Sequence, residues 1–428
     1  MRKIALISEH ASPLACIGSV DSGGQNVYVA QLAKHLARLG YLVDVFTRRD
    51  DESQEQVTEW IPNVRVIHVP AGPARFVPKE AMLPYIEQFG RFMIRFARRQ
   101  KVPYDLVHAN FFMSGMVAQQ IKKMLGIPFV MTFHALGKVR RLSQGQADAF
   151  PDIRFAIEEQ LMQDADRIVA ECPQDRQDME QLYNAPADRI DVVPCGFDPD
   201  EFGPMSTDTR QQLGLPRDEF IILQLGRIVP RKGVDNVIRA AAVLRHEHGI
   251  RSRLLIVGGD GETPDPVATP ELGRLMALAD SLRIEDSVQF TGKRGRDQLR
   301  YYYNAADVFV TTPWYEPFGI TPLEAMACGT PVIGTAVGGI KTTVVEGETG
   351  FLVPPNDAHA LAARLALLQQ QPQLAQRLGW AGMRRAYHQF TWRHVAAQIA
   401  DVYESAIEPV TLYAEPLRAA AGERSLGS

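Results

Sequence analysis

Cysteine is scarce in this chain of 428 residues, which has only Cys16, Cys172, Cys195 and Cys328. None of the four belongs to a CxxC pair, and this spacing excludes a structural zinc site or a disulfide framework and is typical of a reducing compartment. No apolar run approaches the ~18 residues of a membrane-spanning helix. The N-terminal sequence MRKIALISEH also lacks the apolar core of ~7–15 residues that a secretory signal needs. We therefore expect a cytoplasmic protein.

The chain also lacks a large excess of one charge. It has 46 Lys and Arg and 50 Asp and Glu, which gives a formal net charge of −4. A protein whose main partner is nucleic acid would be strongly basic, so we expect no such partner. Hydrophobic residues make up 46% of the chain and charged residues 22%, which excludes an intrinsically disordered chain. The length exceeds the ~250–300 residues at which one hydrophobic core stops growing, and predicts two domains.

Short runs that are apolar on both faces alternate with helix-like periodicity along the whole chain. KIALIS, YLVDVFTR and DLVHAN are examples from a first cycle, and a second cycle begins near Phe220. Such runs are typical of parallel strands covered by helices on both faces. The pattern predicts an α/β fold of two Rossmann-like parallel-sheet domains that face each other across a deep cleft. Ligands of such domains bind at the carboxyl ends of the strands, which here carry His10, Asn110 and His134.

The boundary between the domains is predicted by the segment IDVVPCGFDPDEFGP, which is dense in Pro, Gly and Asp and reads as a linker. We place the first domain at residues 1–197 and the second at 198–390. Amphipathic helices continue to about residue 408. Residues 409–428 are rich in Ala, Gly and Arg, and we expect this tail to be disordered.

Residues 88–101, QFGRFMIRFARRQK, place Phe89, Phe92 and Phe96 at helical spacing among several arginines. One interpretation is a helix that covers the sheet and exposes an arginine-rich face to solvent. The alternative is peripheral contact with an anionic membrane surface. The negative overall charge favours the first interpretation.

The sequence DSGGQN at 21–26 precedes a helical pattern and contains Gly23 and Gly24. Two glycines at a helix start let backbone amides approach an anion such as phosphate, although a simple turn explains them equally well. The dinucleotide fingerprint GxGxxG is absent from this first strand–helix turn, which argues against a dinucleotide-dependent oxidoreductase.

A second motif, GRIVPRKG at 226–233, follows the first strand of the second cycle. Arg227 and Lys232 are spaced so that both cations can face one diphosphate, with Arg as a planar fork and Lys as a point charge. The alternative is a solvated basic turn.

The third motif, EPFGITPLE at 316–324, is the most specific. Thr321 is a suitable N-cap and Pro322 suits the first helical position, so that the surrounding amides would form a second anion-binding helix start. Glu324 either closes a capping box with Thr321 or recognises hydroxyls. Glu316 lies in a loop, where its best use is to accept hydrogen bonds from sugar hydroxyls.

These three motifs, in this order, resemble the signatures of glycosyltransferase family 4, whose members are retaining enzymes of the GT-B fold. The resemblance extends to about residue 407 and implies a nucleotide-sugar donor held mainly by the second domain, with UDP-glucose or UDP-N-acetylglucosamine favoured. It implies transfer of a hexosyl group to a small, phosphorylated polyol or sugar. It also implies that a final helix, 391–408, packs back on the first domain. Alternatives are a transferase of polysaccharide or glycolipid assembly, and a nucleotide-sugar epimerase of the same fold.

The resemblance also assigns roles to single residues. Those matching the catalytic positions are Arg227, Lys232, His134 and Glu316. Glu324 matches the residue that binds ribose, and Arg294 falls where the family contacts the base. The complete donor-binding set is Gly23, Gly24, Arg227, Lys232, Arg294, Glu316, Phe318, Gly319, Ile320, Thr321 and Glu324.

Acceptor residues are implied by two subgroups of the family. The chain is similar to inositol-phosphate N-acetylglucosaminyltransferases at His10, Asn26, Lys79 and Arg154, but Phe111 and Ala135 replace a tyrosine and a threonine of that subgroup. It is similar to sucrose-phosphate synthases in the segment FHALGKVRR, where Lys138, Arg140 and Arg141 either receive a phosphate or are solvated.

No DxD-like motif stands at a strand end, so we expect no metal ion and no other cofactor. Arg227, Lys232 and the helix-start amides would then stabilise the departing nucleoside diphosphate. The resemblance implies a retaining reaction in which the donor phosphate takes the acceptor proton, while Glu316 and His134 orient the sugar.

Overall fold

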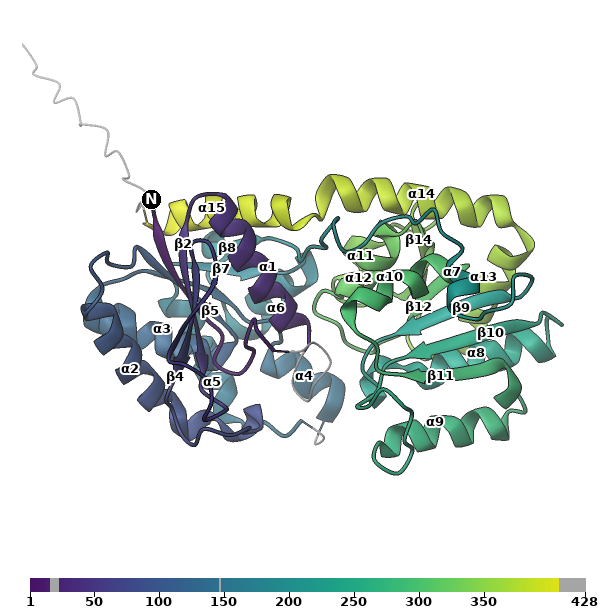
Figure 1. Cartoon of the computed structure of the whole chain (residues 1–428), viewed down its shortest axis with the longest axis horizontal. Helices are drawn as coiled ribbons and strands as arrows, with labels where there is room; N and C mark the ends of the chain where they lie inside the picture. The colour runs from purple at the N-terminus through teal and green to yellow at the C-terminus, as the bar shows by residue number, and fades with distance from the viewer. Residues whose placement is uncertain (16–22, 146–147, 408–428) are drawn as a thin grey trace, which may run out of the picture.

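The computed structural model of the chain describes residues 1–15, 23–145 and 148–407. Two domains lie side by side in Figure 1, the first from the N-terminal half of the chain and the second from most of the C-terminal half. Cys16 and the tail predicted at 409–428 lie outside the described residues.

The first domain is built on an eight-stranded sheet with the order β3-β4-β2-β1-β5-β6-β7-β8. Its strands pair in parallel except for β3 with β4. Every residue of β1, β5 and β6 is buried, as expected of strands covered on both faces. The strands are β1 Lys3–Ile7, β2 Leu42–Arg48, β3 Val57–Ile61, β4 Val64–Val69, β5 Leu106–Asn110, β6 Phe129–Thr132, β7 Arg167–Ala170 and β8 Ile190–Val192.

Helices lie on both faces of this sheet (Figure 1). They are α1 Gly24–Arg38, α2 Ile86–Arg98, α3 Phe112–Leu125, α4 Gly137–Gln144, α5 Ile153–Asp164 and α6 Pro173–Tyr183. Helix α2 directs Phe89 and Met93 into the core, while Arg91, Arg95 and Arg98 are exposed. The aromatic residues of this segment thus cover the sheet, and contact with a membrane stays an untested alternative. No described helix is long and apolar enough to cross a bilayer.

The second domain has a six-stranded sheet, all parallel, with the order β11-β10-β9-β12-β13-β14. Its strands are β9 Phe220–Leu225, β10 Ser252–Val257, β11 Val288–Gly292, β12 Val308–Thr311, β13 Val332–Thr335 and β14 Gly350–Val353. Its helices are α7 Thr209–Gln212, α8 Val234–His246, α9 Pro270–Ser281, α10 Arg296–Ala305, α11 Ile320–Ala327, α12 Ile340–Thr343, α13 Ala358–Gln370 and α14 Pro372–Gln389. Two parallel-sheet α/β domains are therefore confirmed.

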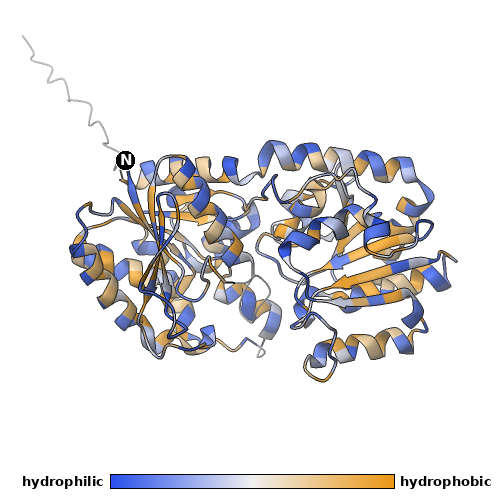
Figure 2. Cartoon of the chain, viewed as in Figure 1, coloured by the Kyte–Doolittle hydropathy of each residue, from blue (hydrophilic) through white to orange (hydrophobic). Residues whose placement is uncertain are grey.

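Apolar residues concentrate in the strands of both sheets, whereas the outward helix faces are hydrophilic (Figure 2). One buried cluster continues from one domain to the other through Phe197 and Trp392, both without exposed surface. The three described cysteines are unpaired and buried.

The last described helix, α15 Trp392–Ile407, returns over the first domain (Figure 1). It packs against α1, β5, β6 and β7. The Tyr403 hydroxyl lies 2.7 Å from His108 Nδ1, and the other ring nitrogen lies 2.8 Å from Thr132 Oγ1. The helix therefore binds the first domain through a buried polar contact as well as apolar packing, while the domain limits at 197 and 390 stay predictions.

The buried ring of His108 predicts a pH dependence of stability. Burial, with a smaller effect of His134, lowers the pKa of His108 to about 3, from 6.5 for an unperturbed histidine. Between these values the unfolded chain binds a proton that the folded chain does not, so stability falls as the pH drops below about 6.5. This component amounts to about 1.4 kcal/mol per pH unit.

Thermal unfolding measured from pH 7.5 to pH 5 checks this prediction. The midpoint of the wild type should fall more steeply with decreasing pH than that of His108→Gln, which keeps a polar side chain but has no proton to gain. Parallel pH profiles would contradict it.

Candidate functional site

The carboxyl ends of the two sheets meet where the domains touch. Cys172, just after β7, donates a hydrogen bond of 3.4 Å from Sγ to the carbonyl oxygen of Pro317 in the second domain. A Cβ atom added to Gly24 would lie 3.8 Å from Ile320 Cδ1. The glycine loop at 23–24 and the loop at 316–320 are thus neighbours, as two separate motifs predicted to bind one ligand must be.

Lys232 and Glu316 form an ion pair at this junction. Lys232 ends the short turn η5 Pro230–Lys232, and Glu316 follows β12. Their side chains are only 19% and 14% exposed. Arg231 Nη1 lies 3.9 Å from the same Glu316 carboxylate oxygen, Oε2.

The ionisation of this pair is set by opposing effects. Burial lowers the pKa of Lys232, and the nearby Arg231 and Arg227 add to this, against the raising effect of Glu316. Burial alone would raise the pKa of Glu316, but Lys232, Arg231 and Arg227 together lower it. The carboxylate is therefore charged at neutral pH. Lys232 and Arg231 lie beside it, and the exposed Arg227 adds a smaller electrostatic effect.

Two glycines allow the loops of this site to approach so closely. Gly233 has φ +63°, and a Cβ there would lie 2.0 Å from the carbonyl oxygen of Thr312. Gly338 has φ +45°, and a Cβ there would lie 1.9 Å from the carbonyl oxygen of Glu316. Both positions exclude a side chain, so backbone contact fixes Lys232 and Glu316 relative to each other.

The start of α11 differs from the prediction for Thr321 and Pro322. The N-cap is Gly319 at φ +85°, and the helix begins at Ile320. Glycine adopts this conformation without strain, so the chain enters the helix before Thr321, which lies within the first turn. The capping-box alternative for Glu324 is wrong, because its carboxylate accepts hydrogen bonds from Arg296 Nη1 at 2.7 Å and the Tyr303 hydroxyl at 2.9 Å.

Phe318 is buried, with its ring centroid 6.3 Å from that of Phe390. Its side chain thus packs in the core, which leaves only its backbone for a ligand. Arg294 Nε donates to the Tyr302 hydroxyl at 3.1 Å, and Nη1 donates to the carbonyl oxygens of Glu262 and Lys293 at 2.8 Å. These bonds fix the segment that the resemblance places near the base.

His134 follows β6 in a left-handed backbone conformation, with φ 59°. Its Nδ1 lies 3.0 Å from Glu171 Oε1 and its Nε2 lies 3.0 Å from Asn110 Oδ1. The ring also packs edge-on against Tyr28, at 4.8 Å between centroids. A strained residue held from three sides is typical of a functional position, and this geometry fixes the ring at the carboxyl edge of the first sheet.

The predicted acceptor residues His10 and Asn26 have partners within the first domain. His10 Nδ1 lies 2.8 Å from Glu9 Oε1, and its ring packs against Phe111. Asn26 Oδ1 accepts from the backbone amide of Gly23 at 2.9 Å, and Nδ2 donates to Ser12. Asn26 therefore shapes the glycine loop. Lys79 begins the turn η1 Lys79–Ala81 and is half-buried.

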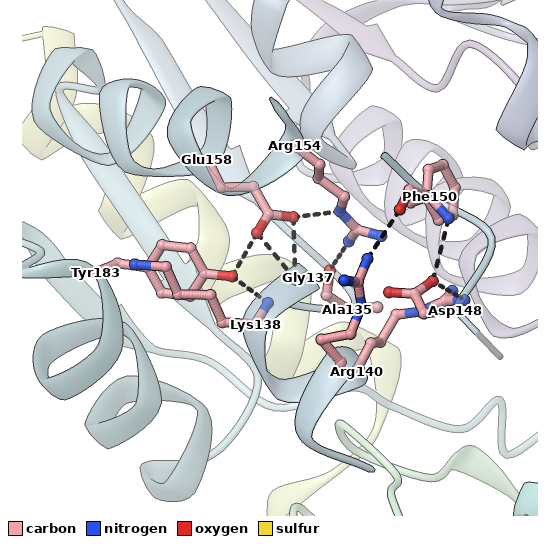
Figure 3. A network of polar contacts seen from close by, with 10 residues as sticks. Ala135, Gly137, Lys138, Arg140, Asp148, Phe150, Arg154, Glu158 and Tyr183 are labelled. Carbon is pink, nitrogen blue, oxygen red and sulfur yellow. Dashed lines mark hydrogen bonds and ion pairs between the residues drawn. The ribbon is translucent and has the colours of Figure 1, made fainter. Parts of the chain in front are cut away.

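Arg154 is completely buried in the polar network drawn in Figure 3. Its Nε donates to Glu158 Oε1 at 2.6 Å, and Nη2 donates to the carbonyl oxygen of Ala135 at 2.5 Å. The guanidinium carbon lies 4.9 Å from the ring centroid of Phe111 and 4.6 Å from that of Phe150. Nη1 is buried and has no hydrogen-bond partner among the residues that the structure describes.

The other cations of this region have partners within the chain, so they are not simply solvated, and their binding of a phosphate stays a prediction. Lys138 Nζ donates to the carbonyl oxygen of Leu182 at 2.6 Å and lies over the Tyr183 ring (Figure 3). Arg140 pairs with Asp148 at 2.9 Å and Arg141 with Asp152 at 2.7 Å. Residues further along the chain supply these partners, acidic side chains for the two arginines and a carbonyl oxygen and an aromatic ring for Lys138, and the motif FHALGKVRR does not contain them.

Several residues of the site were not identified from sequence. They are Arg231, Glu171 and Arg296, which contact predicted site residues. Arg231 lies inside the motif GRIVPRKG but was not assigned a role there, and the other two lie in no motif. Within the described ranges no group of three or more His, Cys, Asp or Glu residues could hold a metal ion. The expectation that no metal is needed stays untested by this observation.

Two protein-family models and several relatives match this chain over most of its length. The family model described as Glycosyltransferase Family 4 matches residues 22–201, and the one described as Glycosyl transferases group 1 matches residues 205–385. D-inositol 3-phosphate glycosyltransferase of Corynebacterium glutamicum is 36% identical, over 95% of this chain and 97% of its own. The protein of the same name from Thermobispora bispora is 37% identical, over 96% of each chain.

Solved structures agree with these relatives. Sucrose-phosphate synthase from Thermosynechococcus elongatus has a TM-score of 0.86 and 36% identity, and the match covers 95% of this chain and 99% of that one. Anabaena HepE, solved in complex with UDP-glucose, has a TM-score of 0.73 and 22% identity, over 95% of this chain and 100% of that one, and shows the fold alone.

The fold and the relatives define a glycosyltransferase with two parallel-sheet domains in the GT-B arrangement. The chain belongs to glycosyltransferase family 4. The resemblance found in the three sequence motifs is thereby confirmed, and the relatives' names support a transferase over the epimerase alternative.

The buried ion pair leads to a stability prediction. Lys232→Met leaves the Glu316 carboxylate without its closest cation, and losing one partner of a buried pair costs about 3 kcal/mol. The double variant Lys232→Met/Glu316→Gln removes both charges and should recover most of this loss. Urea unfolding at pH 7 of the wild type, both single variants and the double variant measures the coupling. Simple additivity of the two single effects would contradict a close ion pair.

Proposed function

We propose that this glycosyltransferase is a retaining hexosyltransferase that uses a nucleotide-sugar, UDP-glucose or UDP-N-acetylglucosamine, and a small phosphorylated polyol or sugar. The observation that carries the proposal is the Lys232–Glu316 ion pair, together with the approach of the following loop to the opposite domain, where a Cβ added to Gly24 would lie 3.8 Å from Ile320 Cδ1. A cation and an anion held together at a domain junction suit a ligand that has both a diphosphate and hydroxyl groups.

Donor binding would exchange the partners of this pair. Lys232 and Arg227 would bind the diphosphate, with help from the amides at the start of α11 and at Gly24. Glu316 would accept hydrogen bonds from sugar hydroxyls, and Glu324 would accept them from ribose. Because the site already holds its charges in place, little reorganisation accompanies the reaction.

The chemistry would then rest on stabilising the leaving group. As the bond between sugar and phosphate breaks, negative charge would grow on the nucleoside diphosphate, where Arg227 and Lys232 would stabilise it. His134, fixed by Glu171 and Asn110, would orient the sugar. The acceptor oxygen would attack from the same face while a donor phosphate oxygen takes its proton, which retains the anomeric configuration. This route follows the family and needs no cofactor.

A phosphorylated acceptor is supported by the relatives' names, D-inositol 3-phosphate glycosyltransferase and sucrose-phosphate synthase. The resemblance assigns Arg154 and Lys79 of the first domain to this acceptor; Arg154 Nη1 is buried without a hydrogen-bond partner among the described residues, and Lys79 is half-buried. Phe111 brings an aromatic ring, without a hydroxyl, next to both His10 and Arg154. The acceptor subsite would thus bind phosphate with fewer hydroxyl donors than the inositol-phosphate subgroup.

A donor screen followed by kinetics tests the proposed donor. Among UDP-, ADP- and GDP-sugars, a UDP-hexose should raise the thermal unfolding midpoint most, because a ligand that binds only the folded state stabilises it. With that donor, Lys232→Ala should lower kcat by about 10²–10³, the usual effect of removing one charge-stabilising donor. The matched control is Lys123→Ala, an exposed lysine of α3. Wild-type turnover in Lys232→Ala would refute the role of Lys232.

The acceptor subsite makes a separate prediction. Lys79→Ala should raise KM for a phosphorylated acceptor, inositol phosphate or a hexose phosphate, at least tenfold, since a hydrogen bond to a charged group contributes about 1.5–3 kcal/mol. KM for the donor should not change. Steady-state assays compare each phosphorylated acceptor with its unphosphorylated form. Equal use of the two forms by the wild-type enzyme would overturn the phosphate assignment.

A further inference from the structure

Arg296 joins two carboxylates that lie far apart in the sequence. It begins α10, where Nη1 donates to Glu324 Oε1 at 2.7 Å and Nε donates to Glu201, which lies in the segment between the domains. The guanidinium carbon also lies 4.7 Å from the ring centroid of Phe202. With only 15% of its side chain exposed, Arg296 has little freedom to move.

Glu324 depends on these contacts for its orientation. Its side chain is 2% exposed, and each of its oxygens accepts one hydrogen bond, Oε1 from Arg296 and Oε2 from the buried Tyr303. One lone pair on each oxygen is then left for a ligand. A carboxylate fixed at both oxygens is well suited to the neighbouring hydroxyls of a ribose, because its acceptor directions are set before the ligand arrives.

The network continues from Glu201 into the first domain. Glu201 Oε1 accepts a hydrogen bond of 3.1 Å from Gln31 Nε2. Gln31 is buried in α1, the helix that begins at Gly24. A continuous set of polar contacts thus joins the helix of the glycine loop, the interdomain segment and the carboxylate predicted to bind ribose.

We propose that Arg296 is a positioning residue for ribose recognition: it holds Glu324 for the ribose hydroxyls and ties it to the interdomain segment through Glu201. The inference rests on the proposed function, in which Glu324 binds the ribose. In this proposal Arg296 acts through Glu324 and not by binding the donor itself. Its role is to fix the direction of the Glu324 lone pairs. The planar guanidinium of arginine does this better than the point charge of a lysine or an apolar side chain.

The test compares the binding of UDP with that of 2′,3′-dideoxyuridine 5′-diphosphate by titration calorimetry. The wild type should bind UDP at least tenfold more tightly. In Arg296→Met this ratio should fall close to one, mainly through weaker binding of UDP, and Arg296→Lys should recover part of it. The control Arg300→Met changes an arginine one turn further along α10, which contacts Tyr301, and should keep the wild-type ratio.

Each outcome distinguishes the inference from the proposed function. A ratio unchanged in Arg296→Met, with or without a lower unfolding midpoint, means that Arg296 is only structural and overturns the inference while the donor assignment stands. A wild type that binds both nucleotides equally contradicts ribose recognition by Glu324 and the inference with it. A wild type that binds neither contradicts the proposed UDP donor, and the inference falls with it. Glu201→Gln, measured in parallel, should lower the ratio less than Arg296→Met, because it leaves the bond from Arg296 to Glu324 intact.

Discussion

The site depends on one buried ion pair, Lys232 with Glu316, formed by loops that follow the strands β9 and β12. Burying either charge alone is unfavourable, whereas in the pair each group offsets part of the cost of burying the other, and Arg231 lies close by. The pair also holds in one place the two kinds of group that an activated sugar requires, a cation for phosphate and an anion for hydroxyls. The close backbone contacts at Gly233 and Gly338 hold the loops of the pair in this geometry.

Around this pair the fold brings together residues from both domains. The carboxyl ends of the two sheets meet at the domain junction. His134 and Gly24 therefore lie on the face of the first domain that is turned toward the ion pair of the second domain. Helix α15 returns to the first domain and packs there through Tyr403 and His108, so the two halves are connected by two crossings of the chain.

Much of the fold and part of the site could be predicted from sequence. Short strands apolar on both faces identify parallel sheets locally, and each glycine or charged motif follows such a strand. The partners of side chains could not be predicted in this way. Arg296, for example, contacts Glu201 and Glu324, which are distant in sequence and come together only in the folded chain. Thr321 also shows the limit, because its sequence suits an N-cap while Gly319, at positive φ, lets the helix begin earlier. The pairing of Lys138, Arg140 and Arg141 likewise depends on distant acidic and carbonyl groups.

A crystal structure of the enzyme with a bound UDP-hexose tests the central claim most directly. The account predicts that the diphosphate lies against Lys232 and the amide of Gly24, and that Glu316 has exchanged Lys232 for hydroxyls of the sugar. A nucleotide bound elsewhere, with the ion pair between Lys232 and Glu316 unchanged, would contradict it.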